Sequence, residues 1–222
     1  VSKQMGSPDL FITITANPGA PEVRACLRRG QQGHDRFDVV TEVFQAHWDQ
    51  LLAEVTRGED DAGGVFGNCI AHFSVLEFQK RGLPHRHLLL WLNHDDVNVR
   101  ADDAADVAAA IDSIVCAGLP STAAAPLRAA VLKTNIHHCD PTRCGKGCFF
   151  PKAPSSQTRL KGEDEAGDFV QYQRDLADTG VSRDRHGRSH EVDASRVVPF
   201  SPYLTLRHNT HINVEVVSTN TS

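Results

Sequence analysis

The sequence lacks any long hydrophobic run. No apolar stretch approaches the roughly 20 residues that a helix needs to cross a bilayer, and the N-terminus has no signal-peptide pattern. We therefore expect an intracellular protein without a membrane segment. A methionine is also missing from position 1, where Val1 stands, and we expect the chain to be a piece of a longer protein.

An excess of positive charge is absent as well. The formal net charge is −5, which argues against a protein that binds nucleic acid through overall electrostatic attraction. It does not exclude a local basic groove, because binding depends on where the charges lie. The chain of 222 residues is 40% hydrophobic and 23% charged, as expected of a globular protein with a buried core.

The apolar pattern predicts both strands and helices. Residues 10–15 are rich in β-branched and aromatic side chains and stop at a turn signal, as a strand does. Apolar residues recur at three- and four-residue steps from Phe37 to Val55, which predicts an amphipathic helix with Asp35 as its N-cap. Further helices are expected over 102–116 and 122–132, short strands over 197–198, 203–206 and 212–217, and an irregular or mobile excursion over 153–195.

Two more strands are predicted within residues 65–79 and over 85–92, joined by a hairpin connection at 80–84. In the second strand, His85, His87, Leu89 and Trp91 share one face. Both faces of this strand are largely apolar. We therefore expect it to be central and covered on both sides, with its histidine end open to a cleft.

His85 and His87 form the first candidate site. Histidines at i and i+2 on a strand point their imidazoles to the same side, within reach of one cation. An oxygen ligand from the neighbouring strand would complete the site, and both Glu77 and Gln79 have the right parity. Glu77 is the preferred ligand, because an anionic oxygen suits Mg²⁺ or Mn²⁺. A solvated strand end that binds nothing is the alternative.

The second candidate site is a compact loop that holds histidines beside three cysteines. His137, Cys139, Cys144 and Cys148 have the spacing and chemistry of a tetrahedral Zn²⁺ site. His138 is an alternative fourth ligand. The loop offers no general base beside an open coordination position, which favours a structural zinc in a reducing compartment. Reduced thiols that bind no metal are the competing interpretation.

Several strings resemble the Helitron Rep domain, also called the Helitron helicase-like domain. The central string is residues 75–87 (VLEFQKRGLPHRH), and residues 10–18 (LFITITANP) resemble the first motif of that family. Later counterparts are residues 148–152 (CFFPK), 196–204 (RVVPFSPYL) and 211–216 (HINVEV). The strings occur in the order of the family and extend along most of the chain.

The resemblance implies an HUH endonuclease with an α+β fold, in which helices flank a central antiparallel sheet, with the small Cys/His zinc loop added. It divides the chain into a nuclease core over 1–136, a zinc loop over 137–152, and the excursion with its returning strands over 153–222. In such enzymes the histidine pair holds a divalent ion against the scissile phosphate while a tyrosine attacks. The implied partners are single-stranded DNA and a C-terminal helicase domain, and the implied location is the nucleus.

The sequence departs from the family pattern at two points. The expected tyrosine helix would follow residues 212–217, but the chain stops first, and its two tyrosines are Tyr172 in the excursion and Tyr203 in a strand-like string. Arg86 stands between the histidines, where a hydrophobic or small residue is usual; contact with a phosphate and a drifted position both remain open. The alternative function is a catalytically degenerate module that binds nucleic acid or is stabilised by zinc.

Overall fold

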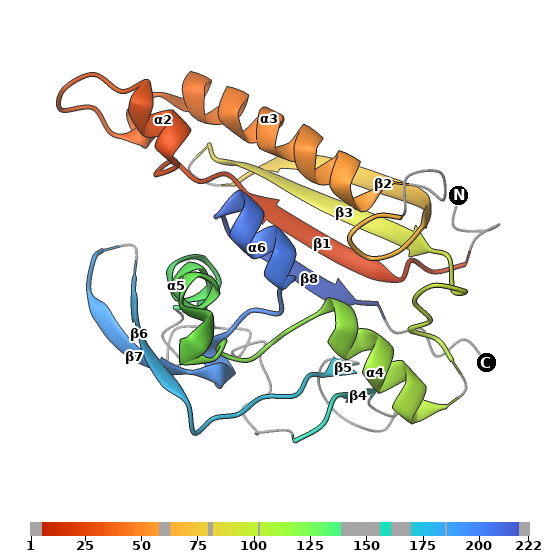
Figure 1. The fold of residues 1–222 in the computed structure, drawn as a ribbon. Helices are drawn as coiled ribbons and strands as arrows, with labels where there is room; N and C mark the ends of the chain where they lie inside the picture. Colours follow the sequence, from red (N-terminus) through yellow and green to blue (C-terminus); the bar gives the residue numbers. More distant parts are fainter. Residues whose placement is uncertain are drawn as a thin grey trace.

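A four-stranded antiparallel sheet forms the centre of the molecule (Figure 1). The computed structural model describes residues 6–57, 63–79, 82–101, 103–138, 156–160, 170–184 and 186–217. The sheet order is β2-β3-β1-β8, and its strands are β1 (Leu10–Thr15), β2 (Cys69–Phe78), β3 (Pro84–Leu92) and β8 (Ile212–Val216). The predicted α+β class with an antiparallel sheet is confirmed.

The longest helix, α3 (Phe37–Val55), lies along one face of the sheet, and α6 (Pro202–His208) lies on the same side (Figure 1). The N-cap of α3 is Arg36 rather than the predicted Asp35. Asp35 instead ends a 3₁₀ turn, where its carboxylate accepts the backbone N–H of Gln32. The remaining α-helices of the described residues are α2 (Pro21–Ala25), α4 (Ala104–Ile114) and α5 (Ala125–Thr134).

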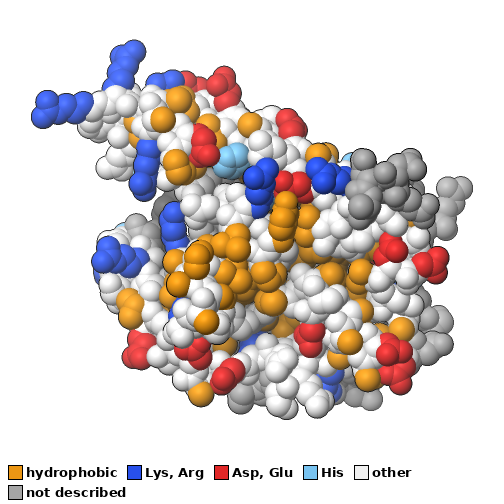
Figure 2. Space-filling model, viewed as in Figure 1, with side chains coloured by type: hydrophobic (Ala, Val, Ile, Leu, Met, Phe, Trp, Pro, Cys, Tyr) orange, Lys and Arg blue, Asp and Glu red, His pale blue; other side chains and the backbone are white. Residues whose placement is uncertain are grey.

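The helix α6 corrects a prediction, since residues 203–206 were expected to form a strand. Pro202 occupies the first turn, and the Ser201 side chain accepts the backbone N–H of Leu204, as an N-cap does. Leu204 is buried in the core, whereas Tyr203 is 51% and Leu206 49% exposed. Hydrophobic side chains gather over α6 in Figure 2. Helix signals at Ser201 and Pro202 therefore outweigh the strand-like composition.

The predicted excursion over 153–195 contains regular structure in its described parts, so that prediction was wrong there. It includes the short pair β4 (Arg159–Leu160) and β5 (Val170–Gln171) and the hairpin of β6 (Thr179–Arg183) and β7 (Ser189–Asp193). Asp184 organises the hairpin turn, because its carboxylate accepts the backbone N–H groups of His186 and Arg188. Val197 belongs to no strand but forms an isolated bridge with Ile136.

The core lies between the sheet and the helices on the α3 side. Alternate residues of β1, β3 and β8 face these helices and are buried: Leu10, Ile12, Ile14, Leu88, Leu90, Ile212, Val214 and Val216. Phe44, Trp48 and Leu51 of α3 pack against them. We call this side of the sheet the covered face.

Strand β3 is central, as predicted, because it pairs with β1 and β2. On the side opposite α3 it is covered near Trp91, which is buried, but not toward its histidine end. Leu89, on the side opposite α3, is half-buried and does not belong to the core, whereas its neighbours Leu88 and Leu90 are fully buried. Apolar composition alone did not distinguish the two sides. No helix among the described residues is long and apolar enough to span a membrane.

Candidate metal centre

The side of the sheet opposite α3 carries most of the polar side chains of the sheet, and we call it the open face. The strand pairing places its residues in rows that cross from β2 through β3 and β1 to β8. The backbone N–H of Thr15 donates to the carbonyl of His211 and extends the pairing by one residue. The rows are Glu77, His85, Thr15, His211; then Val75, His87, Thr13, Asn213; then Phe73, Leu89, Phe11, Glu215.

His85 and His87 lie side by side on the open face, as the strand parity predicted. Their ring centroids are 4.6 Å apart, and the rings meet edge to face. Both side chains are half-buried. Burial is the largest cause that lowers the pKa of His85, and neighbouring His87 and His211 lower it further, whereas Glu77 opposes the shift. The lowered pKa favours the neutral imidazole, which is the form that binds metals.

Glu77 stands directly opposite His85 on β2. Its carboxylate oxygen Oε2 is 3.1 Å from Nε2 of His87. The hairpin therefore brings together the three residues chosen from the sequence. Gln79 lies just beyond the end of β2, where its backbone N–H donates to the carbonyl of Leu83. Gly82 adopts a φ of 75° in the connection, a conformation that glycine tolerates best.

Each imidazole has a further neighbour that fixes its orientation. Nδ1 of His85 is 2.8 Å from the hydroxyl of Thr15. The ring of His87 stacks on Phe11, with a centroid distance of 5.5 Å and an interplanar angle of 10°. Residues of β1 therefore contact both rings, and Glu77 of β2 contacts the ring of His87.

The Glu77 carboxylate suits Mg²⁺ or Mn²⁺, and the two imidazoles favour a transition metal such as Mn²⁺. The arrangement of these three side chains is not yet that of a metal site: within the described residues, no three His, Cys, Asp or Glu side chains are grouped so as to hold an ion. The Glu77 carboxylate hydrogen-bonds to His87, and it does not surround a common ion position together with the two rings. Glu77 is exposed, so its side chain has room to reorient toward an ion without repacking the core.

Comparison with known proteins agrees with the motif analysis. Residues 1–90 match the family model described as the Helitron helicase-like domain at the N-terminus. The predicted Helitron resemblance is confirmed. The matched segment contains β1, α3 and the β2–β3 hairpin with both histidines. No match was found among curated proteins.

Arg86, the unusual residue of the Helitron-like motif, points away from the histidines to the covered face. Its guanidinium lies over the ring of Trp48, with Cζ 4.6 Å from the ring centroid. Its Nη2 donates to the side-chain oxygen of Gln45 at 3.1 Å. Both partners belong to α3. This position answers the question left by the sequence, since Arg86 holds the helix to the sheet and is not presented to a phosphate at the histidine site.

His211 was missed as a member of the open face. Its Nδ1 is 2.8 Å from the carbonyl oxygen of Thr134. Because a carbonyl only accepts, the Nδ1–H of His211 donates and the proton sits on that nitrogen. His211 lies in the motif at 211–216, which the resemblance had singled out, but the sequence does not show that β8 pairs with β1.

The predicted zinc site cannot be assembled from the described residues. Cys139, Cys144 and Cys148 lie outside them, so the Zn²⁺ site remains a prediction. His137 and His138 are described. Burial is the largest cause lowering the pKa of both rings, and Nε2 of His138 is 2.9 Å from the hydroxyl of Ser182 in β6.

Neither tyrosine of the chain is among the partners of His85 and His87. Tyr172 is buried, and its hydroxyl accepts the backbone N–H of Val216 at 3.0 Å. Tyr203 lies on α6, on the covered side of the sheet. The two tyrosines therefore lie away from the histidine pair, and the position of a nucleophile stays a prediction.

Proposed function

We propose that the open face binds single-stranded DNA through a divalent ion held by His85, His87 and Glu77. In the intact Helitron-related protein, this domain would nick and join single-stranded DNA during rolling-circle transposition. The observation that carries the proposal is the meeting of two imidazoles and a carboxylate on an exposed sheet face, at the position that matches the Helitron helicase-like family.

The side chains of the site have distinct tasks in this proposal. His85 and His87 supply neutral ring nitrogens, and Glu77 supplies an anionic oxygen that offsets the charge of the cation. A bound Mg²⁺ or Mn²⁺ would polarise the phosphoryl oxygens of the DNA backbone. Since Glu77 carries the only formal negative charge of the three, removal of this carboxylate is expected to weaken cation binding, and it also removes the hydrogen bond to His87.

The third row of the open face fits the bases of a single strand. Phe73 is 54% exposed, and the half-buried Leu89 and Phe11 lie beside it in the same row. Exposed aromatic rings stack on nucleic-acid bases with little sequence preference. A strand whose phosphate sits at the histidines can therefore place neighbouring bases on these apolar side chains. The negative net charge of the chain is compatible with this local mode of binding.

The experiment is calorimetric titration of Mn²⁺ into the 222-residue chain, followed by fluorescence anisotropy with labelled single-stranded oligonucleotides. We expect one Mn²⁺ per chain and DNA binding that tightens with Mn²⁺. The variant His85→Ala/His87→Ala should lose both. The matched control is His72→Ala, because His72 is exposed on β2 but belongs to the other side of the sheet.

Equal Mn²⁺ binding by the double variant and the parent chain would remove this site from the proposal. A denaturing gel of the same mixtures should show no covalent protein–DNA band, because Tyr172 and Tyr203 are placed elsewhere. DNA binding that ignores both Mn²⁺ and the histidines would favour the alternative, a catalytically degenerate nucleic-acid-binding module. A band that disappears in Tyr203→Phe would show that α6 supplies the nucleophile.

A further inference from the structure

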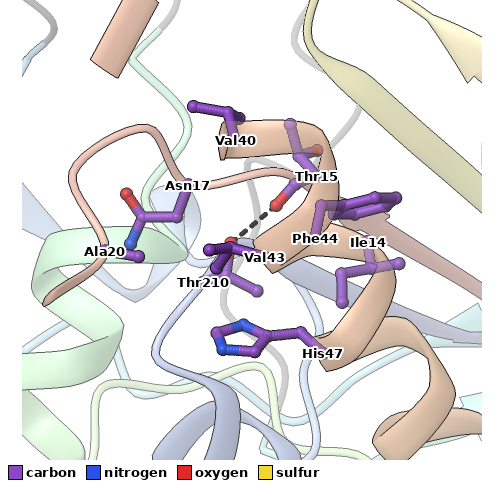
Figure 3. Close-up of a pocket in the computed structure, with 9 residues that line it drawn as sticks. All are labelled: Ile14, Thr15, Asn17, Ala20, Val40, Val43, Phe44, His47 and Thr210. Carbon is purple, nitrogen blue, oxygen red and sulfur yellow. Dashed lines mark hydrogen bonds between the residues drawn. The ribbon is translucent and has the colours of Figure 1, made fainter. Parts of the chain in front are cut away.

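The backbone of Thr15, the last residue of β1, is held by two hydrogen bonds. Its N–H donates to the carbonyl of His211 at 3.1 Å, and its carbonyl accepts the hydroxyl of Thr210 at 2.6 Å (Figure 3). Both partners come from the turn that leads into β8. Threonine is also β-branched, which restricts its side-chain rotation. The Thr15 hydroxyl is consequently held in place independently of the ring that it contacts.

That ring is His85, which stands directly opposite Thr15 in the pairing of β1 and β3. The contact joins the Thr15 hydroxyl to Nδ1 and not to Nε2. Because Thr15 occupies Nδ1, Nε2 is the nitrogen through which His85 would bind a cation. Ligation through Nε2 requires a lone pair on that nitrogen, so a neutral, metal-binding His85 would carry its proton on Nδ1. The Thr15 hydroxyl, which can donate or accept, would then accept this N–H.

We propose that Thr15 is a positioning residue, which orients His85 and selects the tautomer that presents Nε2 to the divalent cation. This inference rests on the proposed function, because it assigns a task to Thr15 in the same site. Hydrogen-bond partners of metal-ligating histidines act in this way generally, and their loss typically weakens metal affinity 10- to 100-fold. The motif at residues 10–18 thereby acquires a task at the histidine site in addition to forming a strand.

Thr13 provides a matched control within the same strand. It lies two residues before Thr15, on the same face, and stands opposite His87. The ring of His87, however, is held by Glu77 and by stacking on Phe11. The substitution Thr→Val removes a hydroxyl and keeps the branched shape at either position. Only at position 15 should the substitution remove a hydrogen bond to a histidine ring.

The experiment compares Thr15→Val, Thr15→Ser and Thr13→Val with the parent 222-residue chain in two measurements. Mn²⁺ titration by calorimetry should show binding weakened about tenfold in Thr15→Val, with Thr15→Ser and Thr13→Val close to the parent chain. Long-range ¹H–¹⁵N NMR of the metal-free proteins reports which ring nitrogen of His85 is protonated. The signal is assigned by its loss in His85→Gln. We expect Nδ1–H in the parent chain and in Thr15→Ser, and a shift toward Nε2–H in Thr15→Val.

The outcomes separate the two proposals. A parent chain that binds no Mn²⁺ overturns the proposed function and, with it, this inference. A parent chain that binds Mn²⁺ while Thr15→Val binds it equally well overturns the inference alone. If Thr15→Val does not fold, the parent chain and Thr15→Ser still decide, because His85 protonated at Nε2 in the parent chain contradicts the proposal.

Discussion

The two faces of the sheet are built from the same strands yet differ in almost every property. On the covered face, Leu88 and Leu90 are fully buried beneath α3. On the open face, their chain neighbours His87 and Leu89 are half-buried. The edge strand β2 is exposed on both faces, since Phe73 of the open face is 54% and Phe78 of the covered face 60% exposed. Alternation along a strand therefore assigns stability to one side and chemistry to the other.

This division explains how a polar site coexists with a central strand. The free energy of folding comes mainly from apolar area removed from water, and β1, β3 and β8 supply it on the covered side. The open side is then free to carry His85, His87 and Glu77, which contribute little to burial. Substitutions at adjacent residues of β3 should therefore affect different properties, namely stability on the covered face and metal binding on the open face.

The largest expected effect is loss of stability on the covered face. Leu88→Ala should lower the free energy of unfolding by about 2–5 kcal/mol, because it deletes a fully buried side chain and leaves a cavity. Leu89→Ala, the next residue on the opposite face, should cost only about 1 kcal/mol, since its side chain is half-buried. Urea unfolding followed by circular dichroism measures both. Equal losses would show that the open face is covered after all.

The second prediction concerns a polar pair on the covered side that joins α3 to α6. His208 is buried, and its Nε2 lies 3.0 Å from a carboxylate oxygen of buried Glu54, which also accepts from Arg207. Burial lowers the pKa of His208 more than Glu54 raises it, and His47 and Arg207 lower it further. The unfolded chain, with an ordinary histidine pKa near 6.5, therefore takes up the proton more readily than the folded chain.

Stability contributed by neutral His208 is consequently present above pH 6.5 and is lost as the pH falls toward the lowered pKa of the folded state. Urea unfolding at several pH values between about 5.5 and 7.5 should show a slope for this group of at most about 1.4 kcal/mol per pH unit, the limit for one proton. His208→Gln should flatten the dependence. If the slope is the same in both proteins, His208 does not titrate on unfolding.

The sheet strands could be predicted from the sequence because short runs rich in apolar, β-branched or aromatic residues are bounded by turn signals. The hairpin register of Glu77 and His85 followed from the short connection between their strands. Residues 203–206 were assigned wrongly, since in so short a segment composition says less than the capping residues Ser201 and Pro202. The hairpin of β6 and β7 was missed because its polar strands, which include exposed Val181, lack an apolar face.

The candidate site was predictable only within one hairpin. His85, His87 and Glu77 are close in the sequence, so strand parity sufficed to place them together. Thr15 and His211 are 70 and 126 positions away from His85, and their places depend on the sheet order β2-β3-β1-β8. No local pattern encodes that order. The direction of Arg86 followed from parity, but its stacking on Trp48 required the position of α3 on the sheet.

The smallest expected effect gives the sharpest test of the two faces, because Arg86 stands between His85 and His87 in the chain. Arg86→Met keeps an unbranched side chain of about the length of the arginine stem and removes the guanidinium that lies over Trp48 and donates to Gln45. We expect a loss of about 1 kcal/mol in the free energy of unfolding and no change in Mn²⁺ affinity. His85→Ala/His87→Ala should show the reverse, with Mn²⁺ binding lost and stability nearly kept. Chemical unfolding and calorimetry on the same two preparations measure both quantities. Should Arg86→Met weaken Mn²⁺ binding as much as the histidine variant does, the guanidinium acts at the site, and the assignment of Arg86 to the covered face is wrong.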